Sequence, residues 1–247
     1  MKKYVQFIIL GSLMAGMSAC DKQNSTPVND PSFTEGFDNL SKAVAKGWSI
    51  KNNTKPLGTI SWQQGSYYIA MAPTFDSKMG GTNYPYLGGF GGANPSYSGS
   101  DFVMTTSECG SGAAHCSNWL ISPETTIKNG DVVSFYTRTY DNPAVGADRI
   151  EVRVNTVNGM ADVGTTPEGV GNFKAVILDI NPDYLLEGDG SYPGEWTKFT
   201  ATVSGLPSNA ARKSRIAIRY YVPDGGPQGT NGLGVGIDEF EFISVSR

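Results

Sequence analysis

The sequence predicts an all-β fold, an antiparallel β-sandwich of two sheets. In residues 133–138 apolar and polar side chains alternate, which is the period-two pattern of a half-buried strand. Residues 148–155 repeat the pattern, with Glu151 and Arg153 on the face opposite three β-branched side chains. Both stretches are rich in β-branched and aromatic residues, which favour strands over helices. Many short strands with almost no helix are typical of a sandwich or a barrel.

The rest of the chain supplies further short strands, separated by turns rich in Gly, Pro and Asn. Only residues 39–46 are predicted to form a short helix, with Ala43, Val44 and Ala45 as its apolar part. No repeat of about 20–50 residues occurs, which argues against a propeller or a solenoid. Besides the two stretches above, strands are predicted over residues 33–38, 47–50, 59–62, 67–72, 102–105, 119–121, 173–180, 195–203, 214–222 and 235–245.

The N-terminal residues 1–19 are predicted to be a secretion signal. Two lysines precede the largely apolar residues 4–17, and small residues follow before Cys20. Such a segment is too short for a membrane span and is excluded from the fold. Residues 20–32 are polar, contain two prolines and show no periodicity, so we expect a flexible tether. Residues 33–247 then form one sandwich domain, a size that all-β domains commonly reach.

The charge of the chain argues against nucleic acid as a partner. Removal of residues 1–19, which carry two lysines and no acids, moves the formal net charge from −4 to −6. No run of Lys and Arg occurs anywhere, whereas proteins that bind nucleic acid need clustered basic side chains.

The two cysteines of the mature chain lie close together in the sequence. Cys109 and Cys116 in a secreted protein predict a disulfide. Closing such a short loop stabilises the fold by roughly 2–3 kcal/mol in the chain-entropy model. The alternative is a metal site that includes His115, the only histidine, but this group lacks a fourth ligand.

A change of composition marks residues 73–100, where Gly, Tyr, Asn, Ser and Pro dominate. Long loops in compact domains are usually functional or disordered. Tyrosines among Gly and Ser form the adaptable contact surface of many binding loops, and aromatic faces stack on sugar rings. The alternative is a loop that covers an open sheet edge. The predicted ligand-binding residues of this segment are Tyr84, Tyr86, Phe90 and Tyr97.

The sequence contains no motif that predicts catalysis. Neither a G-x-S-x-G elbow nor an H-E-x-x-H helix is present, and a histidine-based triad would have to use His115. A glycosidase needs only two suitably spaced carboxylates, and nothing singles out such a pair. We therefore predict that the protein is not an enzyme, with a glycan-cleaving enzyme as the least favoured alternative.

An ordered set of motifs resembles the choice-of-anchor J domain of bacterial surface proteins. The resemblance covers Phe33 to Phe242 and implies a jelly roll related to cleaved-adhesin and galactose-binding-like domains, without catalysis or an assigned ligand. The chain departs from the family pattern in the Cys109–Cys116 segment and in the extended Gly/Tyr segment. The motifs that carry the resemblance are FDNL, GW at Trp48, WQQG at Trp62, SNWLISP, GDVVSFYTRT, DRIEVRVN, VGNFKAVILDINP, YPGEWTKFTATVSGLP, RIAIRYYV and GVGIDEFEF.

The residues Met17-Ser18-Ala19-Cys20 resemble a bacterial lipobox, which implies lipidation of Cys20. Met17 stands where leucine is usual. The alternative is ordinary cleavage near Ala19. Several acyl chains would tether the protein firmly, because each buried methylene contributes about 0.8 kcal/mol.

The resemblance to related jelly rolls also implies a structural calcium ion where the first and last strands meet. Asp38 ends the first strand, and Asp238 shares strand parity with Phe240, which predicts an inward-pointing carboxylate that needs a partner. The implied ligands are Asp38 and Asp238, with Glu35 as a third acid, completed by backbone carbonyls. The alternative is that these acids bind turn amides or face solvent.

Taken together, these features predict a lipid-anchored protein of the bacterial envelope that recognises a glycan or a protein without catalysis. The alternative is a structural or accessory subunit of a surface complex. Membrane contact is expected only through the N-terminal lipid. We expect an outer-membrane, surface-exposed location, while the inner membrane and the periplasmic face stay open alternatives.

Overall fold

The chain divides into two compact units, Met1–Asp30 and Pro31–Arg247. A computed structural model describes most of the second unit. No helix among the described residues is long and apolar enough to cross a membrane. The structure describes residues 30–66, 73–75, 83–85, 101–140 and 146–245.

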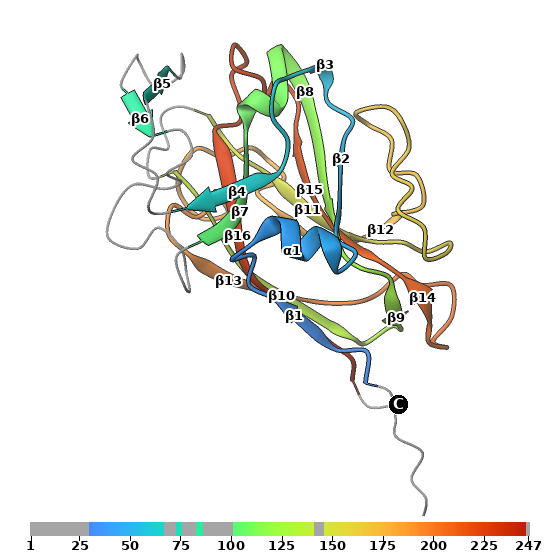
Figure 1. The fold of residues 1–247 in the computed structure, drawn as a ribbon. Coiled ribbons are helices and arrows are strands. Elements are labelled where there is room, and N and C mark those ends of the chain that lie inside the picture. Colours follow the sequence, from blue (N-terminus) through green and yellow to red (C-terminus); the bar gives the residue numbers. More distant parts are fainter. Residues whose placement is uncertain (1–29, 67–72, 76–82, 86–100, 141–145, 246–247) are drawn as a thin grey trace, which may run out of the picture. The chain divides into compact units, whose positions relative to one another are not determined.

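Two six-stranded antiparallel sheets form the domain (Figure 1). Sheet A has the strand order β13-β10-β16-β7-β4, and β1 also pairs with β16. Its strands are β1 (Phe33–Glu35), β4 (Gln63–Ser66), β7 (Asp101–Thr106), β10 (Val132–Thr139), β13 (Thr197–Thr202) and β16 (Gly234–Ile243).

Sheet B has the strand order β12-β11-β15-β8-β2, and β3 also pairs with β8. Because the two sheets are antiparallel and carry the core between them, the all-β sandwich prediction is confirmed. The strands of sheet B are β2 (Ser49–Asn52), β3 (Lys55–Leu57), β8 (Gly110–Ile121), β11 (Ile150–Val154), β12 (Ala175–Ile180) and β15 (Ile216–Val222).

A few smaller elements complete the described part of the domain. They are two-stranded ribbons and short helical segments, and none adds a layer to the sandwich (Figure 1). They comprise the ribbon of β9 (Thr125–Ile127) with β14 (Arg212–Ser214), the ribbon of β5 (Pro73–Phe75) with β6 (Asn83–Pro85), the helix α1 (Leu40–Ala45) and a 3₁₀ turn at Ser107–Cys109.

The first and last strands are joined in the core of the domain. Phe33 of β1 lies opposite Phe242 of β16. The Phe33 ring stacks on Phe240 with 5.8 Å between ring centroids, and Trp48 meets Phe240 edge to face at 5.1 Å. Aromatic pairs of this kind contribute about 0.5–1.5 kcal/mol each beyond their buried area. This cluster therefore holds the N-terminal segment onto sheet A.

Helix α1 confirms the one helix that the sequence predicts. Asn39 caps it, because its side-chain oxygen accepts a hydrogen bond from the Lys42 N–H at 2.9 Å. The Leu40 N–H donates to the side-chain oxygen of Gln64 in β4 at 2.6 Å, and buried Ala43 packs on the core. The helix thus lies beside the edge of sheet A.

Two predicted segments differ in the structure. The residues between Cys109 and Cys116 are predicted as a loop, but they belong to strand β8, because β3 pairs with them and the Gly225 N–H donates to the Ala114 carbonyl at 2.7 Å. The strand predicted over residues 59–62 begins only at Gln63. Thr59 and Ile60 are held in a turn, since both backbone N–H groups donate to the carbonyl of Glu108.

Candidate functional site

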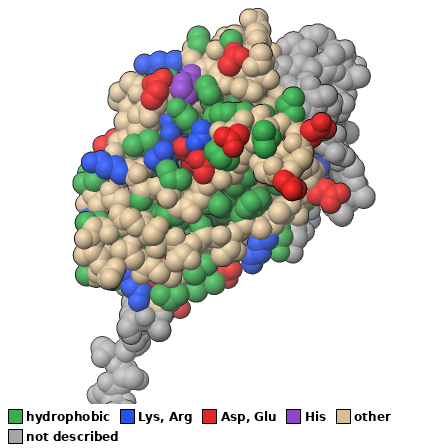
Figure 2. All heavy atoms as spheres, turned by 180° about the vertical axis from the view of Figure 1, so that it is seen from behind, with side chains coloured by type: hydrophobic (Ala, Val, Ile, Leu, Met, Phe, Trp, Pro, Cys, Tyr) green, Lys and Arg blue, Asp and Glu red, His purple; other side chains and the backbone are tan. Residues whose placement is uncertain are grey.

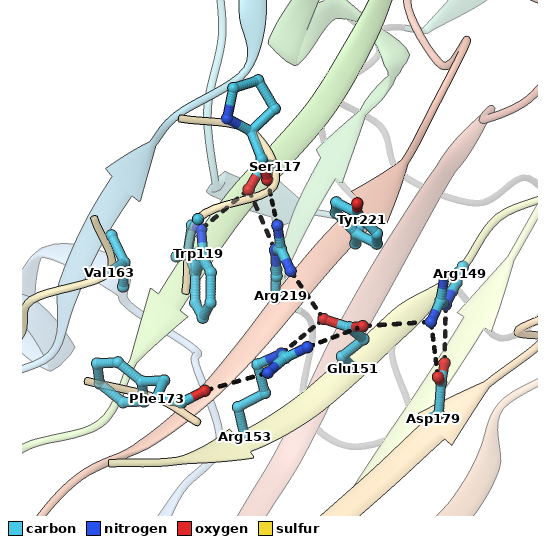
Figure 3. Close-up of polar contacts among 12 residues, drawn as sticks. Ser117, Trp119, Arg149, Glu151, Arg153, Val163, Phe173, Asp179, Arg219 and Tyr221 are labelled. Atoms are coloured by element: carbon cyan, nitrogen blue, oxygen red, sulfur yellow. Dashed lines mark hydrogen bonds and ion pairs between the residues drawn. The ribbon is translucent and has the colours of Figure 1, made fainter. Parts of the chain in front are cut away.

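The outer face of sheet B carries a cross-strand row of charged and aromatic side chains (Figure 3). Strand alternation turns the aliphatic residues of β11 and β15 into the core and puts their charged neighbours on the outer side. The strand register then aligns Asp179, Glu151, Arg219 and Trp119 across β12, β11, β15 and β8. We call the whole set the arginine–aromatic face. It consists of Trp119, Arg149, Glu151, Arg153, Asp179, Arg219 and Tyr221.

Glu151 is the centre of an ion network on this face. Its carboxylate accepts from Arg219 at 3.0 Å, from Arg153 at 2.7 Å and from Arg149 at 3.2 Å. Arg149 also donates two parallel hydrogen bonds to Asp179, at 2.8 and 2.7 Å. The forked geometry of the guanidinium matches a carboxylate and fixes both groups. Three guanidinium groups and two carboxylates leave the network with one net positive charge.

The pKa shifts follow from this arrangement. Burial raises the pKa of Glu151, but the hydrogen bonds and charges of Arg153 and Arg219 outweigh burial and hold it below its usual range. Burial lowers the pKa of Arg219, and Glu151 opposes that shift. The hydrogen bond to Asp179 raises the pKa of Arg149. Glu151, with its lowered pKa, and Arg149, with its raised pKa, therefore carry their charges at neutral pH.

Arg219 lies between two aromatic rings. Its guanidinium carbon is 3.7 Å from the ring centre of Tyr221 and 4.7 Å from that of Trp119. Its Nε donates to the Ser117 hydroxyl at 3.1 Å, and one Nη donates to the Pro167 carbonyl. A guanidinium group that stacks and donates in this way cannot be replaced by lysine without loss of contacts.

A long connection covers one part of the face. Residues 155–174 link β11 to β12, and Val163 and Phe173 from this segment pack on Trp119. The Phe173 and Trp119 rings lie 5.8 Å apart. The covering segment removes water from the Arg219–Glu151 pair and leaves the opposite side of the face accessible.

The accessible side offers donors, acceptors and aromatic rings together. Arg149 donates to the Tyr184 hydroxyl at 2.9 Å, and that hydroxyl donates to the Tyr221 carbonyl at 3.2 Å. The His115 ring lies 4.9 Å from the Tyr221 ring, and its Nδ1 is 3.2 Å from Glu168. Figure 2 shows basic and acidic side chains next to each other on this face. We call this part the open rim; it consists of His115, Arg149, Glu168, Tyr184 and Tyr221.

The open rim is held rigidly by the buried network beneath it. Burying charged pairs gains little stability over apolar side chains of the same size. A buried network that instead fixes half-exposed side chains is a feature of preorganised binding sites. The arrangement is therefore suited to recognition by hydrogen bonds, because it presents guanidinium, hydroxyl and carboxylate groups in fixed positions.

Sequence reasoning found only part of this site. The alternation of residues 148–155 placed Glu151 and Arg153 on the outer face, and the structure confirms that side. The burial of Glu151, which is only 3% exposed, was missed. Arg219 and Tyr221 were missed too. The available signal was their spacing of two residues in β15, because strand alternation puts residues two apart on the same face.

Two of the three acids predicted to bind calcium lie on the paired strands, Glu35 in β1 and Asp238 in β16, whereas Asp38 does not end the first strand as predicted, because β1 stops at Glu35 and Asp38 follows at an exposed position. Glu35 lies opposite Phe240, and Asp238 is fully buried, with its Oδ1 accepting from the Glu239 N–H at 2.8 Å. A methyl group added at Gly36 would lie 3.4 Å from a carboxylate oxygen of Glu239 and 3.5 Å from one of Asp38. Sequence reasoning missed Glu239, which lies as close to Gly36 as Asp38 does.

These acids fit a calcium ion only in part. Glu35 forms an ion pair with Lys46 at 2.9 Å, so its charge is already balanced. Across the described residues, no group of three or more His, Cys, Asp or Glu side chains is placed to hold a metal ion. The calcium site at Asp38 and Asp238 stays a prediction.

Cys109 and Cys116 are both buried and are not bonded to each other in the structure. The Thr54 hydroxyl lies 3.8 Å from the Cys109 sulfur, as a weak donor. His115 pairs with Glu168, on the outer side of the sheet. The disulfide stays a prediction that chemical analysis of the thiols can test.

The predicted ligand-binding tyrosines fall mostly outside the described residues. Tyr84 lies in β6 opposite Thr74, and only its backbone is described. Tyr86, Phe90 and Tyr97 lie outside the described residues, so their role in binding stays a prediction.

Comparison with known proteins supports the fold. No family model matches the chain, and no curated protein matches its sequence. Among solved structures, the K1 cleaved adhesin domain of Lys-gingipain from Porphyromonas gingivalis W83 is similar over 87% of this chain and 99% of that chain, with 17% identity and a TM-score of 0.50. The K2 cleaved adhesin domain of Lys-gingipain covers 86% and 99% of the two chains, with 17% identity and a TM-score of 0.49. The likeness to the K1 domain shows the jelly-roll fold, and the choice-of-anchor J resemblance stays a prediction.

Proposed function

We propose that this protein is a non-catalytic recognition module of the bacterial envelope that binds a glycan through the open rim. The observation that carries the proposal is the fixed group of Arg149, Tyr184 and Tyr221 above the buried Arg219–Glu151 pair. Each sugar hydroxyl both donates and accepts a hydrogen bond. A ligand rich in hydroxyls therefore needs a surface that offers donors and acceptors side by side.

The open rim meets this need. The Arg149 guanidinium donates, and the Glu168 side chain, 66% exposed, accepts, as does the carboxylate of Asp179 next to the rim, which is 27% exposed. The tyrosine hydroxyls do both. Because the charges nearly cancel, the rim suits neutral glycans better than a strongly charged polymer.

A protein partner is the second candidate, for a specific reason. Met160 and Val157, on the covering segment, are 65% and 43% exposed. Exposed methionine is typical of protein-binding surfaces. A structural or accessory subunit of a surface complex would use such a surface.

The test is a glycan array probed with the full-length protein. Tyr184→Phe removes one hydroxyl, and Glu168→Gln removes one exposed charge, while both keep the shape of the rim. We expect each variant to weaken binding about tenfold, since hydrogen bonds to charged groups contribute about 1.5–3 kcal/mol. Lys198→Gln, on β13 of sheet A, is the matched control and should bind like the wild type. A blank array with intact protein would remove the glycan proposal and direct the search to a protein partner.

The proposed location rests on the N-terminal residues. We propose lipidation at Cys20 and transfer to the outer membrane, with the domain at the cell surface. Support comes from the lipobox-like residues 17–20 and the polar tether that follows them. Labelling with a fatty-acid analogue should mark the wild type and not Cys20→Ala, and a protease added to intact cells should remove the domain. Label on Cys20→Ala would contradict lipidation at this residue.

A further inference from the structure

The N-terminal segment enters the domain at one end of the sandwich, and hydrogen bonds fix the point of entry. The Thr125 hydroxyl donates to the Pro31 carbonyl at 3.1 Å, and the Ser244 N–H donates to the Ser32 hydroxyl at 2.9 Å. Thr125 belongs to β9, which pairs with β14, and Ser244 follows β16. The chain therefore enters between the β9–β14 ribbon and the end of β16 (Figure 1).

The same end carries four of the nine large apolar side chains that are exposed among the described residues. Val157 and Met160 are 43% and 65% exposed, and Ile243 and Val245 are 41% and 37% exposed. Ile243 and Val245 flank Ser244 at the point of entry. Single exposed apolar side chains are common, whereas a group of them marks an interaction surface.

Arginines next to the ribbon hold the turn that displays Val157 and Met160. The Arg212 guanidinium donates to the Val157 carbonyl, and Arg215 Nε donates to the Gly159 carbonyl at 2.6 Å. Arg212 is the first residue of β14, so the turn is fixed beside the ribbon. We call the surface around the point of entry the tether end. It consists of Val157, Met160, Arg212, Lys213, Ile243 and Val245.

The tether end is net positive on a domain that is acidic overall. The chain has 19 Lys and Arg and 23 Asp and Glu, of which three lysines and one aspartate precede residue 30, so residues 30–247 carry 16 basic and 22 acidic side chains, a net charge of −6. The tether end and its flanking loops contribute +1, which leaves −7 on the remainder. An anionic surface therefore attracts this end and repels the rest of the domain. The charged side chains counted here are Lys128, Arg212, Lys213 and Arg215 against Asp30, Glu124 and the fully buried Asp131.

The tether is short enough to keep this end near a membrane that holds Cys20. Eleven residue steps separate Cys20 from Pro31, and they span at most about 40 Å. Docking of a tethered domain is an intramolecular event, so a surface that binds weakly in free solution is sufficient. The length of the tether and the charge of the domain thus both favour a lipid surface as the occupant.

We propose that the tether end docks on an anionic phospholipid surface, with Arg212 and Lys213 at the head groups and Val157 and Met160 among them. The proposal rests on the proposed lipidation of Cys20, which brings the tether to the membrane. Contact with the membrane then extends beyond the N-terminal lipid.

Docking in this orientation leaves the open rim accessible. Strand β15 begins at Ile216, next to Arg215, and reaches Tyr221 of the rim five residues later. At about 3.3 Å per residue, Tyr221 lies about 17 Å farther along the sheet than Ile216. The rim is therefore presented away from the membrane while the tether end contacts it.

The experiment couples residues 20–247 to vesicles through the Cys20 thiol and a maleimide phospholipid. Cys109 and Cys116 are buried and do not compete for the maleimide. One set of vesicles contains phosphatidylglycerol and phosphatidylethanolamine, and the other contains only phosphatidylcholine. Because the coupling is chemical, the experiment tests docking separately from lipidation in cells and from glycan binding by the rim.

The readout is the rate of chemical modification, followed by mass spectrometry. Peroxide oxidises Met160, and an acetylating reagent modifies Lys213, whose side chain is 66% exposed. Lys55, exposed on β3 at the other end of β8, is the internal reference. On the anionic vesicles we expect both sites to react at least about fivefold more slowly than in the uncoupled protein, which is the factor that one basic side chain contributes near an anionic membrane. Lys55 should react at the same rate in both.

Two charge reversals test the cause of the protection. Lys213→Glu should restore the oxidation rate of Met160 on anionic vesicles to that of the uncoupled protein. Lys55→Glu makes the same change of charge away from the tether end and should leave Met160 protected. Both side chains are exposed, so neither change disturbs the core.

Several results would overturn the proposal. Equal reaction rates in the coupled and uncoupled protein would show that the tether end does not dock. Equal protection on both kinds of vesicle, or protection that survives Lys213→Glu, would show that anionic lipid does not orient the domain. Protection of Met160 in isolated envelopes but not on protein-free vesicles would assign this end to a protein partner instead.

Discussion

Arg219 and Glu151 form an ion pair with 3.0 Å between Nη1 and Oε2, and their side chains are only 1% and 4% exposed. Removal of one partner from a buried pair leaves an uncompensated charge, which typically costs about 3–5 kcal/mol. In Glu151→Gln, three guanidinium groups would stay together with one carboxylate fewer. We expect this variant to lose about 3–5 kcal/mol of unfolding free energy in urea denaturation.

The exposed Glu195→Gln makes the same change of charge outside the network and serves as the control. It should leave the denaturation midpoint unchanged, because surface charges contribute little. A loss below about 1 kcal/mol in Glu151→Gln would show that the network is not stabilised by its central carboxylate.

The cysteine pair gives a second prediction. We expect protein isolated from an oxidising compartment to contain a Cys109–Cys116 disulfide, because both side chains lie in the same buried core cluster. Intact mass measured after alkylation without reductant should show no modified core thiol, and after reduction and unfolding it should show two. Reduction should lower the melting temperature, in line with roughly 2–3 kcal/mol from loop closure. Alkylation of both thiols in the unfolded, unreduced protein would contradict the bridge.

The strands of the sheets could be predicted from sequence because apolar and polar side chains alternate along a half-buried strand. Ile150, Val152 and Val154 identify β11 without knowledge of its neighbours, and Asn39 marks the start of α1 through a local cap. These signals depend on residues close in the chain. The order of strands in the sheets depends on distant pairings, so these local patterns do not predict it.

The site could not be predicted in the same way. The burial of Glu151 depends on Arg219, far along the chain, and on a segment that covers Trp119. Neither contact produces a pattern among the residues next to Glu151 in the sequence. The burial of Asp148 could not be predicted either, because a single acid before a strand is common. Only the structure shows the four hydrogen-bond donors around its carboxyl group.

Calcium removal tests the third prediction. If Asp38 and Asp238 hold a calcium ion between β1 and β16, excess calcium should raise the melting temperature above that in EDTA. Ligand that binds only the folded state stabilises it in proportion to the logarithm of its concentration. Asp38→Asn changes an exposed side chain, and it should remove this difference in melting temperature between calcium and EDTA. Equal melting temperatures of the wild type in both buffers would count against the site.

The pH dependence of stability tests the state of Asp148. Burial raises the pKa of Asp148 above its ordinary value of 3.8, although hydrogen bonds from Thr139, Tyr220 and two backbone N–H groups oppose the shift. The folded protein therefore binds this proton more tightly than the unfolded chain does. As the pH rises above 3.8, the unfolded chain loses the proton first, and the unfolding free energy falls until the folded pKa is passed.

Asp148→Asn cannot titrate, so it should escape this loss of stability. We expect the unfolding free energy of the variant, measured relative to the wild type by urea denaturation, to increase as the pH rises from about 4 to about 8. The other titrating groups, including Glu151 with its lowered pKa, are present in both proteins and cancel in the difference. Asp183→Asn, at an exposed position, should show no such trend. A relative stability that stays constant or falls with pH would mean that Asp148 carries its charge in the folded protein, because its four donors would then outweigh its burial.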